Sequence, residues 1–353
     1  MRIAYGVHGY GRGHSSRALA VLPELTARHE VLVLAGDEAH AALAGEYDVV
    51  RIPVMRYVLN AAGRRSALRT LAGGLVASRD RAWGGPGLQV VRSAVEAFKP
   101  DVIVSDSEAW THRAGKLLGL PRISFDHFGV LVWCDWPMGG PDRVVCRIES
   151  MLYLQMMSGG GDRAVVASFY APPVRRSGVR VVGPVLREIV RGQAPSAGDY
   201  LLVYLANGQR HYTPRVEAAL KALTVPTIVY GVGREGTDGA VEYRAPSNTR
   251  FVADLAGCRA VFATAGNQLI SEAMHFRKPM LLLPEDSLEQ RLNAAAVEKM
   301  GAGLATTRRT VSPERVRELL GRADELAANI PPVTDGRAEA VAAIEQFAAE
   351  LTA

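Results

Sequence analysis

The sequence predicts an α/β protein made of two doubly wound domains. Short runs rich in Val, Ile and Leu alternate along the chain with longer amphipathic segments. Continuous apolar strands separated by helices are typical of parallel sheets covered on both faces. The pattern restarts near Tyr200, and a chain of 353 residues, 48% of them apolar, suits two cores better than one. Two Rossmann-like domains are therefore expected.

The apolar runs fix the expected strands. In the first domain they are Arg2–Val7, Glu30–Ala35, Asp48–Ile52, Asp101–Ser105, Arg122–Phe125 and Ala164–Ser168. In the second they are Tyr200–Leu205, Thr227–Tyr230, Thr249–Val252, Ala260–Ala263 and Pro279–Leu283. Ligands of such sheets bind beyond the carboxyl ends of the strands. Two facing domains would therefore share an interdomain cleft.

A polar stretch marks the expected domain boundary. Residues 187–199 are poor in large apolar side chains and are interpreted as a linker. The first domain then spans 1–186 and the second 200–353. The last helix could still pack back on the first domain.

Charge and composition restrict the partners. The net charge of +5 permits an anionic substrate or membrane surface, but the chain lacks the interleaved aromatics and basic stripe of a nucleic-acid binder. No apolar run approaches the ~18 residues of a transmembrane helix, and the start has no signal-peptide layout. Cys134, Cys146 and Cys258 lack CxxC spacing and are expected to be buried thiols. A soluble, cytoplasmic protein is predicted.

Residues 56–83 fit the two-domain pattern less well, because arginines are scattered among Leu, Ala and Val. This segment could be a solvated helix and loop, or a lip that faces the acceptor or the inner membrane surface as a peripheral contact. Its arginines are Arg56, Arg64, Arg65, Arg69, Arg79 and Arg81.

A glycine-rich loop follows the first strand and leads into a helix. The glycines stand at alternate positions, so this loop matches neither the GxGxxG fingerprint nor a phosphate-binding P-loop. They would let the backbone approach a ligand closely. Ser15 or Ser16 is expected to cap the helix, and Pro23 to kink or break it. The loop glycines are Gly9, Gly11 and Gly13.

His14 stands where this loop meets the helix. It could be a hydrogen-bonded helix-start residue or a general base, since an imidazole with a pKa of ~6.5 can take a proton from a hydroxyl. Asp106 follows a strand that ends at the same sheet edge, so it could fix the imidazole tautomer. Asp126 and His127, after the next strand, are a second candidate pair.

The strongest pattern lies between residues 263 and 303. A strand ends at Ala263 and a helix starts near Asn267, where free N–H groups and the positive helix end suit a diphosphate. A carboxylate within the next two turns could reach a ribose diol, and the helix after the following strand could reach sugar hydroxyls. The predicted contacts are Gly266, Asn267 and Gln268 for phosphate, Glu272 for ribose, and Glu289 and Gln290 for the sugar.

This stretch resembles the donor-binding region of the GT-B glycosyltransferases of families 1 and 28, which include macrolide and plant-type enzymes and the lipid II N-acetylglucosaminyltransferase. The loop from Gly11 to His14 resembles the Gly-His loop of the same families. The resemblance implies the donor contacts given above, with His14 as the acceptor base and Asp106 as its partner. The matching positions are Gly266, Glu272, Lys278-Pro279, Pro284, Glu289-Gln290, Asn293-Ala294, Gly301 and Gly303.

Three positions depart from the family pattern. Ala265 stands where His, Ser or Gly is common, which would leave phosphate contact there to backbone amides. Glu289 replaces the usual Asp of an Asp-Gln pair. The loop 206–209 lacks the frequent Gly-Ser.

The resemblance implies an inverting, metal-independent hexosyltransferase whose co-substrate is a nucleoside-diphosphate sugar, with UDP, TDP or GDP left open and no further cofactor. The acceptor would be a small molecule or lipid-linked. No Asp-x-Asp metal motif is needed, and Asp106-Ser107-Glu108 is interpreted as base partner plus helix cap. Two alternatives stay open. A sugar-nucleotide 2-epimerase would need further carboxylates, and a non-catalytic nucleotide-sugar-binding protein would not need His14.

Overall fold

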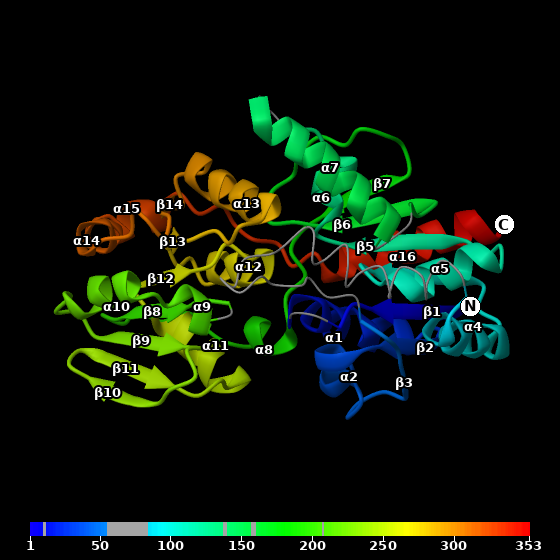
Figure 1. The fold of residues 1–353 in the computed structure, drawn as a ribbon, viewed down its shortest axis with the longest axis horizontal. Helices are drawn as coiled ribbons and strands as arrows, with labels where there is room; N and C mark the ends of the chain where they lie inside the picture. The colour runs from blue at the N-terminus through cyan, green and yellow to red at the C-terminus, as the bar shows by residue number, and fades with distance from the viewer. Residues whose placement is uncertain (10–11, 55–83, 137–139, 157–159, 207) are drawn as a thin grey trace. The chain divides into compact units, whose positions relative to one another are not determined.

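The computed structural model describes residues 1–9, 12–54, 84–136, 140–156, 160–206 and 208–353 (Figure 1). They form two compact units: unit 1 comprises Met1–Arg187 and Asp335–Ala353, and unit 2 comprises Glu188–Thr334. Residues 188–199, predicted to be a linker, belong to unit 2, whereas the last helix belongs to unit 1, the packing that the sequence analysis left open for it. The predictions made for residues 56–83 and for Gly11 lie outside the described residues.

Unit 1 is a seven-stranded parallel sheet in the order β3-β2-β1-β4-β5-β6-β7. Its strands carry continuous apolar runs because helices cover both faces. The strands are β1 (Arg2–Val7), β2 (Glu30–Ala35), β3 (Val49–Arg51), β4 (Val102–Asp106), β5 (Arg122–Asp126), β6 (Arg163–Ala167) and β7 (Val179–Val182).

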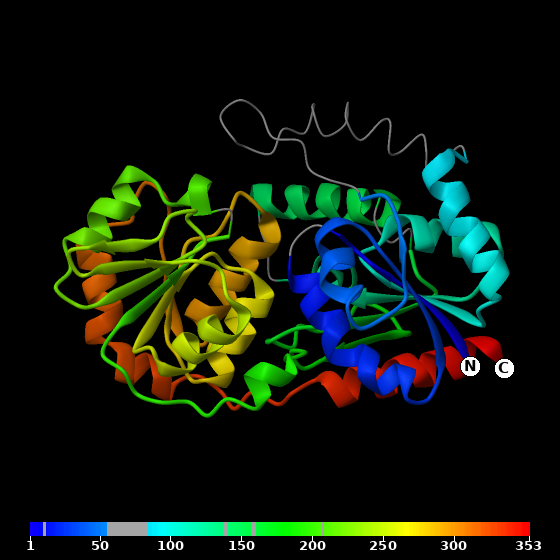
Figure 2. The ribbon, with the colours of Figure 1, turned by 90° about the horizontal axis from the view of Figure 1, so that it is seen from below.

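A separate apolar core covers each face of this sheet. Helices α1, α2 and α16 share one apolar core with it, and α4 and α5 share the other. Figure 2 shows α16, in red, running along unit 1 and ending close to the N-terminus. The helices of unit 1 are α1 (Arg12–Thr26), α2 (Asp37–Leu43), α4 (Pro86–Phe98), α5 (Ala109–Leu117), α6 (Gly129–Trp133), α7 (Gly140–Met156) and α16 (Arg337–Thr352).

Unit 2 is a seven-stranded sheet in the order β10-β11-β9-β8-β12-β13-β14, parallel except for the β10–β11 pair. The strands are β8 (Leu201–Tyr204), β9 (Thr227–Tyr230), β10 (Gly236–Asp238), β11 (Val241–Arg244), β12 (Ala260–Ala263), β13 (Met280–Leu282) and β14 (Gly303–Ala305). The helices are α8 (Glu188–Arg191), α9 (Gly208–His211), α10 (Pro214–Lys221), α11 (Asn248–Gly257), α12 (Asn267–His275), α13 (Leu288–Lys299), α14 (Pro313–Gly321) and α15 (Ala323–Ala328).

One predicted strand is wrong. Residues 249–252 lie in α11, whose start is capped by the Ser247 side chain as it accepts a hydrogen bond from Arg250 N at 3.2 Å. Val252, Leu255 and Ala256 are buried at the three- and four-residue spacing of a helix. The strand of this region is β11, which the sequence analysis missed together with the other short strands β7, β10 and β14.

The predicted start of α1 is also wrong. The helix begins at Arg12, so Ser15 and Ser16 lie inside its first turns and are not caps. It also runs on through Pro23, where a kink or break was expected, to Thr26. Pro23 lacks the N–H that would bond to the carbonyl of Leu19, but the next turn still closes, because Ala27 N donates to Pro23 O at 3.3 Å.

Two predictions from composition meet direct observations. None of the described helices is long and apolar enough to span a membrane. Cys134, Cys146 and Cys258 are buried free thiols, as expected.

Candidate active site

The first predicted pair comes together at the carboxyl edge of the unit 1 sheet. Asp106 ends β4, and His14 lies in the first turn of α1. His14 Nδ1 is 2.6 Å from Asp106 Oδ1. The carboxylate is fully buried, whereas 14% of the His14 side chain is exposed. Because the buried carboxylate fixes the ring through Nδ1, the other ring nitrogen, Nε2, is the one that could act on a ligand.

A third member of this cluster, Arg17, was missed by sequence reasoning. Its Nε donates to Asp106 Oδ2 at 2.8 Å and its Nη2 donates to Oδ1 at 2.5 Å, in a bidentate pair. Arg17 follows His14 by three residues on α1, which puts both on one face of the helix. That spacing was the only sequence signal for it. Arg17 thus holds both oxygens of the carboxylate that orients His14.

The charge of Asp106 decides the tautomer of His14. Burial acts to raise the pKa of Asp106, but the charges of Arg17 and then His14 outweigh it and hold that pKa below its usual range. An ionised carboxylate only accepts hydrogen bonds, so the short contact requires a proton on His14 Nδ1. The lone pair of neutral His14 then lies on Nε2. The contact of 3.2 Å between Nδ1 and Arg17 Nη2 joins two donors in this tautomer.

A second imidazole, His8, packs against the first. The rings of His8 and His14 meet edge to face, with their centroids 5.1 Å apart. Burial, followed by the nearby charge of His14, lowers the pKa of His8 to about 3. His8 therefore stays neutral at working pH and adds no positive charge beside His14.

Asp126, from the second predicted pair, extends the buried network. It ends β5 and accepts hydrogen bonds from Ser107 Oγ at 2.9 Å, from Gly129 N at 2.8 Å and from the Tyr153 hydroxyl. Burial, followed by the charge of Asp106, raises the pKa of Asp126 to about 6. Its three donors all come from the protein, which is what a structural member of the network needs.

His127, the other half of that pair, points to a different neighbour. Its Nδ1 lies 2.9 Å from the carbonyl oxygen of Ala167, at the end of β6. The ring also meets Tyr170 edge to face, with centroids 5.9 Å apart. These contacts hold the ring against β6 and the segment that follows it.

Glu108 is the helix cap that the sequence analysis expected. Its carboxylate accepts hydrogen bonds from Trp110 N at 2.9 Å and Thr111 N at 2.6 Å, at the start of α5. Both carboxylates of the Asp106-Ser107-Glu108 run therefore bind protein donors. The described part of the chain contains no cluster of three or more His, Cys, Asp or Glu side chains able to hold a metal ion.

The predicted phosphate loop lies in unit 2 between β12 and α12. Gly266 is the N-cap of α12 and has no side chain to cap the helix. A Cβ added to Gly266 would meet no protein atom within 4 Å, so the backbone can be approached there. Asn267 Oδ1 is buried and has no hydrogen-bond partner among the described residues. A glycine-capped helix start of this kind, with its positive dipole end, is suited to an anion.

Helix α13 holds this loop in place. Gln290 Oε1 accepts hydrogen bonds from Ala265 N at 3.1 Å and from Glu285 N at 2.9 Å. Asn293 Nδ2 donates to Ala265 O at 3.0 Å. The Ala265 amide is thus bonded to Gln290, and the expectation that backbone amides of this loop contact phosphate stays a prediction for the amides that follow it. Gln290, predicted to bind the sugar, retains only its Nε2 donor for a ligand.

The remaining predicted donor residues also contact one another. Glu272 lies on α12 and is 2% exposed, and its Oε1 accepts from Gln268 Nε2 at 2.9 Å. Glu289 Oε1 accepts from Asn293 Nδ2 at 2.7 Å. The structure thus brings these side chains to the edge where β12 and β13 end, already ordered by short protein contacts.

A buried histidine at the same edge was not predicted. His211, in α9 after β8, is 1% exposed, and its Nε2 lies 3.3 Å from Glu285 Oε1, in the loop after β13. The two residues are 74 positions apart, and no local spacing connects them. Only the strand order, with β12 between β8 and β13, joins these loops.

Solved structures share this two-sheet architecture. CalG4, the calicheamicin glycosyltransferase, superposes with a TM-score of 0.69 over 99% of both chains at 18% identity. Phytolacca americana UGT2, solved with UDP-2-fluoroglucose and pterostilbene, superposes with a TM-score of 0.66 over 99% of this chain and 98% of that one at 13% identity. The fold is that of the GT-B glycosyltransferases, as predicted.

The sequence comparisons identify the family. The family model described as glycosyl transferase family 1 matches residues 1–323 of this chain. A glycosyltransferase of Methanosarcina acetivorans, itself uncharacterized, is 28% identical over 330 residues, which cover 86% of this chain and 85% of that one. The protein belongs to glycosyl transferase family 1.

The buried Asp126 generates a prediction for stability. Its pKa of about 6 in the folded protein exceeds the ordinary value of 3.8, so the folded state holds a proton that the unfolded chain releases. Stability from this group falls as pH rises through that window. The Asp126→Asn variant cannot ionise at this position. As the pH rises from 5 to 8, the wild type should therefore lose on the order of 1 kcal/mol more of its free energy of unfolding than this variant does.

Urea titrations followed by tryptophan fluorescence would measure this difference in unit 1, because all four tryptophans fall within residues 1–187. Glu96→Gln, at an exposed carboxylate of α4, is the control and should show no such gain. Parallel pH profiles for Asp126→Asn and the wild type would contradict the raised pKa.

Proposed function

We propose that this glycosyltransferase moves a sugar from a nucleoside-diphosphate sugar to an acceptor hydroxyl, with inversion and without a metal. The observation that carries the proposal is the contact between His14 and Asp106, which leaves the Nε2 lone pair of a partly exposed ring available as a base. An oriented imidazole is suited to removing a hydroxyl proton at neutral pH.

The start of α12 supports a diphosphate donor. Its N–H groups and helix dipole can compensate the charge that develops on a departing nucleoside diphosphate, which is the task that a metal performs elsewhere. Asn267 and Gln268 lie in the first turn and Glu272 in the second. A family-fold neighbour solved with UDP-2-fluoroglucose supports UDP as the first donor to test, followed by TDP.

The proposed reaction is one displacement at the anomeric carbon. His14 Nε2 takes the proton of the acceptor hydroxyl as its oxygen attacks. Asp106 stabilises the resulting imidazolium, and Arg17 keeps Asp106 ionised and oriented. The bond to the leaving phosphate breaks as the new glycosidic bond forms, so a single step inverts the configuration.

Two features favour transfer over the alternatives. Membership of a glycosyltransferase family argues against a 2-epimerase. The ordered network of His14, Asp106 and Arg17 would have no purpose in a protein that only binds the donor, since such a cluster is costly to bury. We propose a cytoplasmic enzyme, in keeping with its free thiols and its proposed nucleotide-sugar substrate.

A nucleoside diphosphate should raise the melting temperature of the protein more than the corresponding monophosphate does.

Glu272→Gln should raise the Kd for UDP or TDP by about 10-fold, because hydrogen bonds to a charged group contribute ~1.5–3 kcal/mol. Calorimetric titration would measure Kd, with Glu314→Gln, an exposed residue of α14, as the matched control. If UDP, TDP, GDP and ADP all leave the melting temperature unchanged, unit 2 is not the donor site.

Transfer should survive metal removal. The charge on the leaving group would be met by the α12 helix end, so incubation with EDTA should leave the initial rate of sugar transfer within about 2-fold of the untreated enzyme. The assay compares EDTA-treated enzyme with and without added Mg²⁺ or Mn²⁺. Loss of activity on chelation and its return with metal would contradict the helix-end account.

His14→Ala should lower kcat by ~10²- to 10⁴-fold, the range for positioned acid–base catalysis, and leave the Kd for UDP nearly unchanged. Asp106→Asn should lower kcat less, because it only orients the imidazole. His29→Ala, at a ring that pairs with Glu345 on α16, is the control and should keep its activity. Near-normal kcat in His14→Ala would move the base to His127, and loss of UDP binding would make His14 a phosphate ligand.

A further inference from the structure

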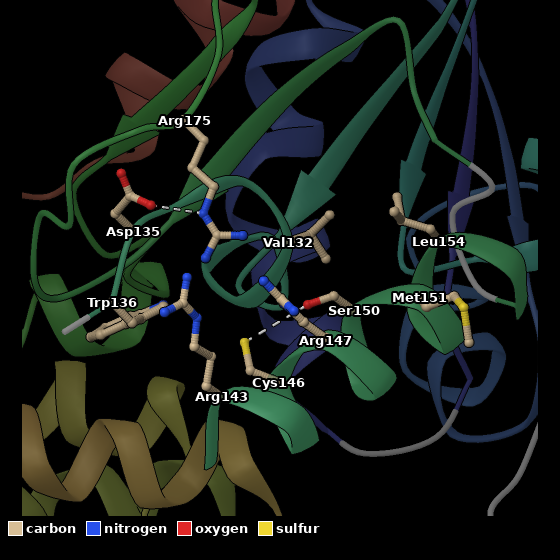
Figure 3. Close-up of a pocket in the computed structure, with 10 residues that line it drawn as sticks. All are labelled: Val132, Asp135, Trp136, Arg143, Cys146, Arg147, Ser150, Met151, Leu154 and Arg175. Carbon is tan, nitrogen blue, oxygen red and sulfur yellow. Dashed lines mark hydrogen bonds and ion pairs between the residues drawn. The ribbon is translucent and has the colours of Figure 1, made fainter. Parts of the chain in front are cut away.

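Unit 1 contains a cavity of about 710 Å³ that the proposed chemistry does not use. It opens beside α7, in the region between α6 and the segment after β6 (Figure 3). Its size is that of a small-molecule site. Three arginines, Trp136, Met151 and Leu154 are among the side chains that line it.

The walls of the cavity are held by defined contacts. Asp135 N donates to Pro173 O at 2.7 Å and Arg175 N donates to Trp133 O at 2.8 Å, so a short antiparallel pairing fixes one side. On the other side, Ser150 Oγ of α7 donates to the carbonyl oxygen of Leu131 in α6 at 2.8 Å. Trp136 Nε1 donates to Val130 O at 2.8 Å. The cavity therefore lies between elements tied to each other.

Its charge is strongly positive. Figure 3 shows the guanidinium groups of Arg143, Arg147 and Arg175 directed toward one another across the opening. Asp135 pairs with Arg175 at 3.0 Å, whereas Arg143 and Arg147 make no ion pair with any described residue. Guanidinium groups repel one another, and they converge on phosphate because their N–H pairs match its oxygens. The arrangement favours a phosphate group as ligand.

An apolar ridge continues from this charged opening. Val144, Ile148 and Met151 are 58%, 49% and 51% exposed, and their spacing places them on one side of α7. Arg143 and Arg147 each precede one of the first two along the helix. Large apolar side chains gathered on one exposed helix face indicate contact with an apolar partner. A free phosphate ion would leave this ridge unused, whereas a phosphate carried on a hydrocarbon chain would cover it.

Helix α7 also connects the cavity to the proposed base. Tyr153, two residues beyond Met151, donates its hydroxyl proton to Asp126 Oδ2, and Leu154 beside it lines the cavity. At ~1.5 Å of rise per residue, Arg147 and Tyr153 are about 9 Å apart along the helix axis. Helix α7 thus carries side chains that line the cavity and, one to two turns further on, a residue that binds Asp126 in the buried network beside Asp106.

We propose that this cavity binds the phosphate group of a lipid-linked acceptor, with Arg143, Arg147 and Arg175 on the phosphate and the Val144–Ile148–Met151 ridge on the hydrocarbon chain. The inference rests on the proposed function, since it names the class of acceptor whose hydroxyl His14 would activate. It assigns the acceptor to unit 1 through residues separate from the donor loop of unit 2.

Binding of three probes would test the proposal on the full-length protein. Dodecyl phosphate, kept below its critical micelle concentration, carries both a phosphate and a hydrocarbon chain. Inorganic phosphate carries only the anion, and dodecyl maltoside carries the same chain on an uncharged head group. Calorimetric titration would measure binding, and tryptophan fluorescence would report a ligand beside Trp136, which lines the cavity. Dodecyl phosphate should bind at least about 10-fold more tightly than either of the others, because both halves of the site contribute.

Paired variants separate the two halves. The double variant Arg143→Gln and Arg147→Gln should raise the Kd for dodecyl phosphate by about 10-fold or more, because charge-assisted hydrogen bonds are lost. The double variant Val144→Ser and Ile148→Ser should raise the Kd for dodecyl phosphate and leave the Kd for inorganic phosphate unchanged. All four residues are exposed, so the melting temperature should hold. Arg92→Gln, at an exposed arginine of α4, is the control.

Three results would overturn the proposal. Equal affinity for dodecyl phosphate and inorganic phosphate would show a site for soluble anions. Unchanged binding in the double arginine variant would place the probe elsewhere. Displacement of dodecyl phosphate by UDP would show that the arginines serve the donor diphosphate. The thermal shift with UDP is measured separately, so failure of this inference with an intact UDP shift would leave the proposed donor site standing.

Discussion

The proposed chemistry depends on one buried carboxylate. Asp106 is shared between Arg17, which donates to both its oxygens, and His14, whose Nδ1 donates a hydrogen bond to one of them. A buried carboxylate without a cation would tend to gain a proton, and it could then no longer require a proton on His14 Nδ1. Arg17 prevents this. The free lone pair on Nε2 is therefore a consequence of an ion pair on the far side of the carboxylate.

The same edge of the sheet uses a second carboxylate differently. Asp126 lies next to Asp106 in the network, but its pKa is raised to about 6 and its oxygens accept hydrogen bonds from neutral donors. Two nearby carboxylates with divergent pKa values are a common way to separate a charged role from a structural one. Through Tyr153, Asp126 also links the base network to α7, which carries the basic cavity.

In unit 2 the constraint is backbone hydrogen bonding. The loop before α12 has to be rigid if it is to present the start of α12 to the proposed donor. Gln290 and Asn293 achieve this by binding the Ala265 amide and carbonyl from α13. The Glu-Gln and Asn-Ala positions of the family pattern thus have a structural duty in this chain. A substitution there would move the loop proposed to bind phosphate even if neither side chain touched a ligand.

The sequence by itself determined the two doubly wound units, most strands and the pair of His14 with Asp106, because apolar runs and strand ends are local patterns that parallel sheets convert into position. It misplaced residues 249–252, since a four-residue segment with two neighbouring apolar side chains is too short for its pattern to distinguish helix from strand. The partnership of His211 with Glu285, the donors around Asp126 and the cavity beside α7 came only from the tertiary structure. Those contacts join segments far apart in the chain, and strand order brings them together.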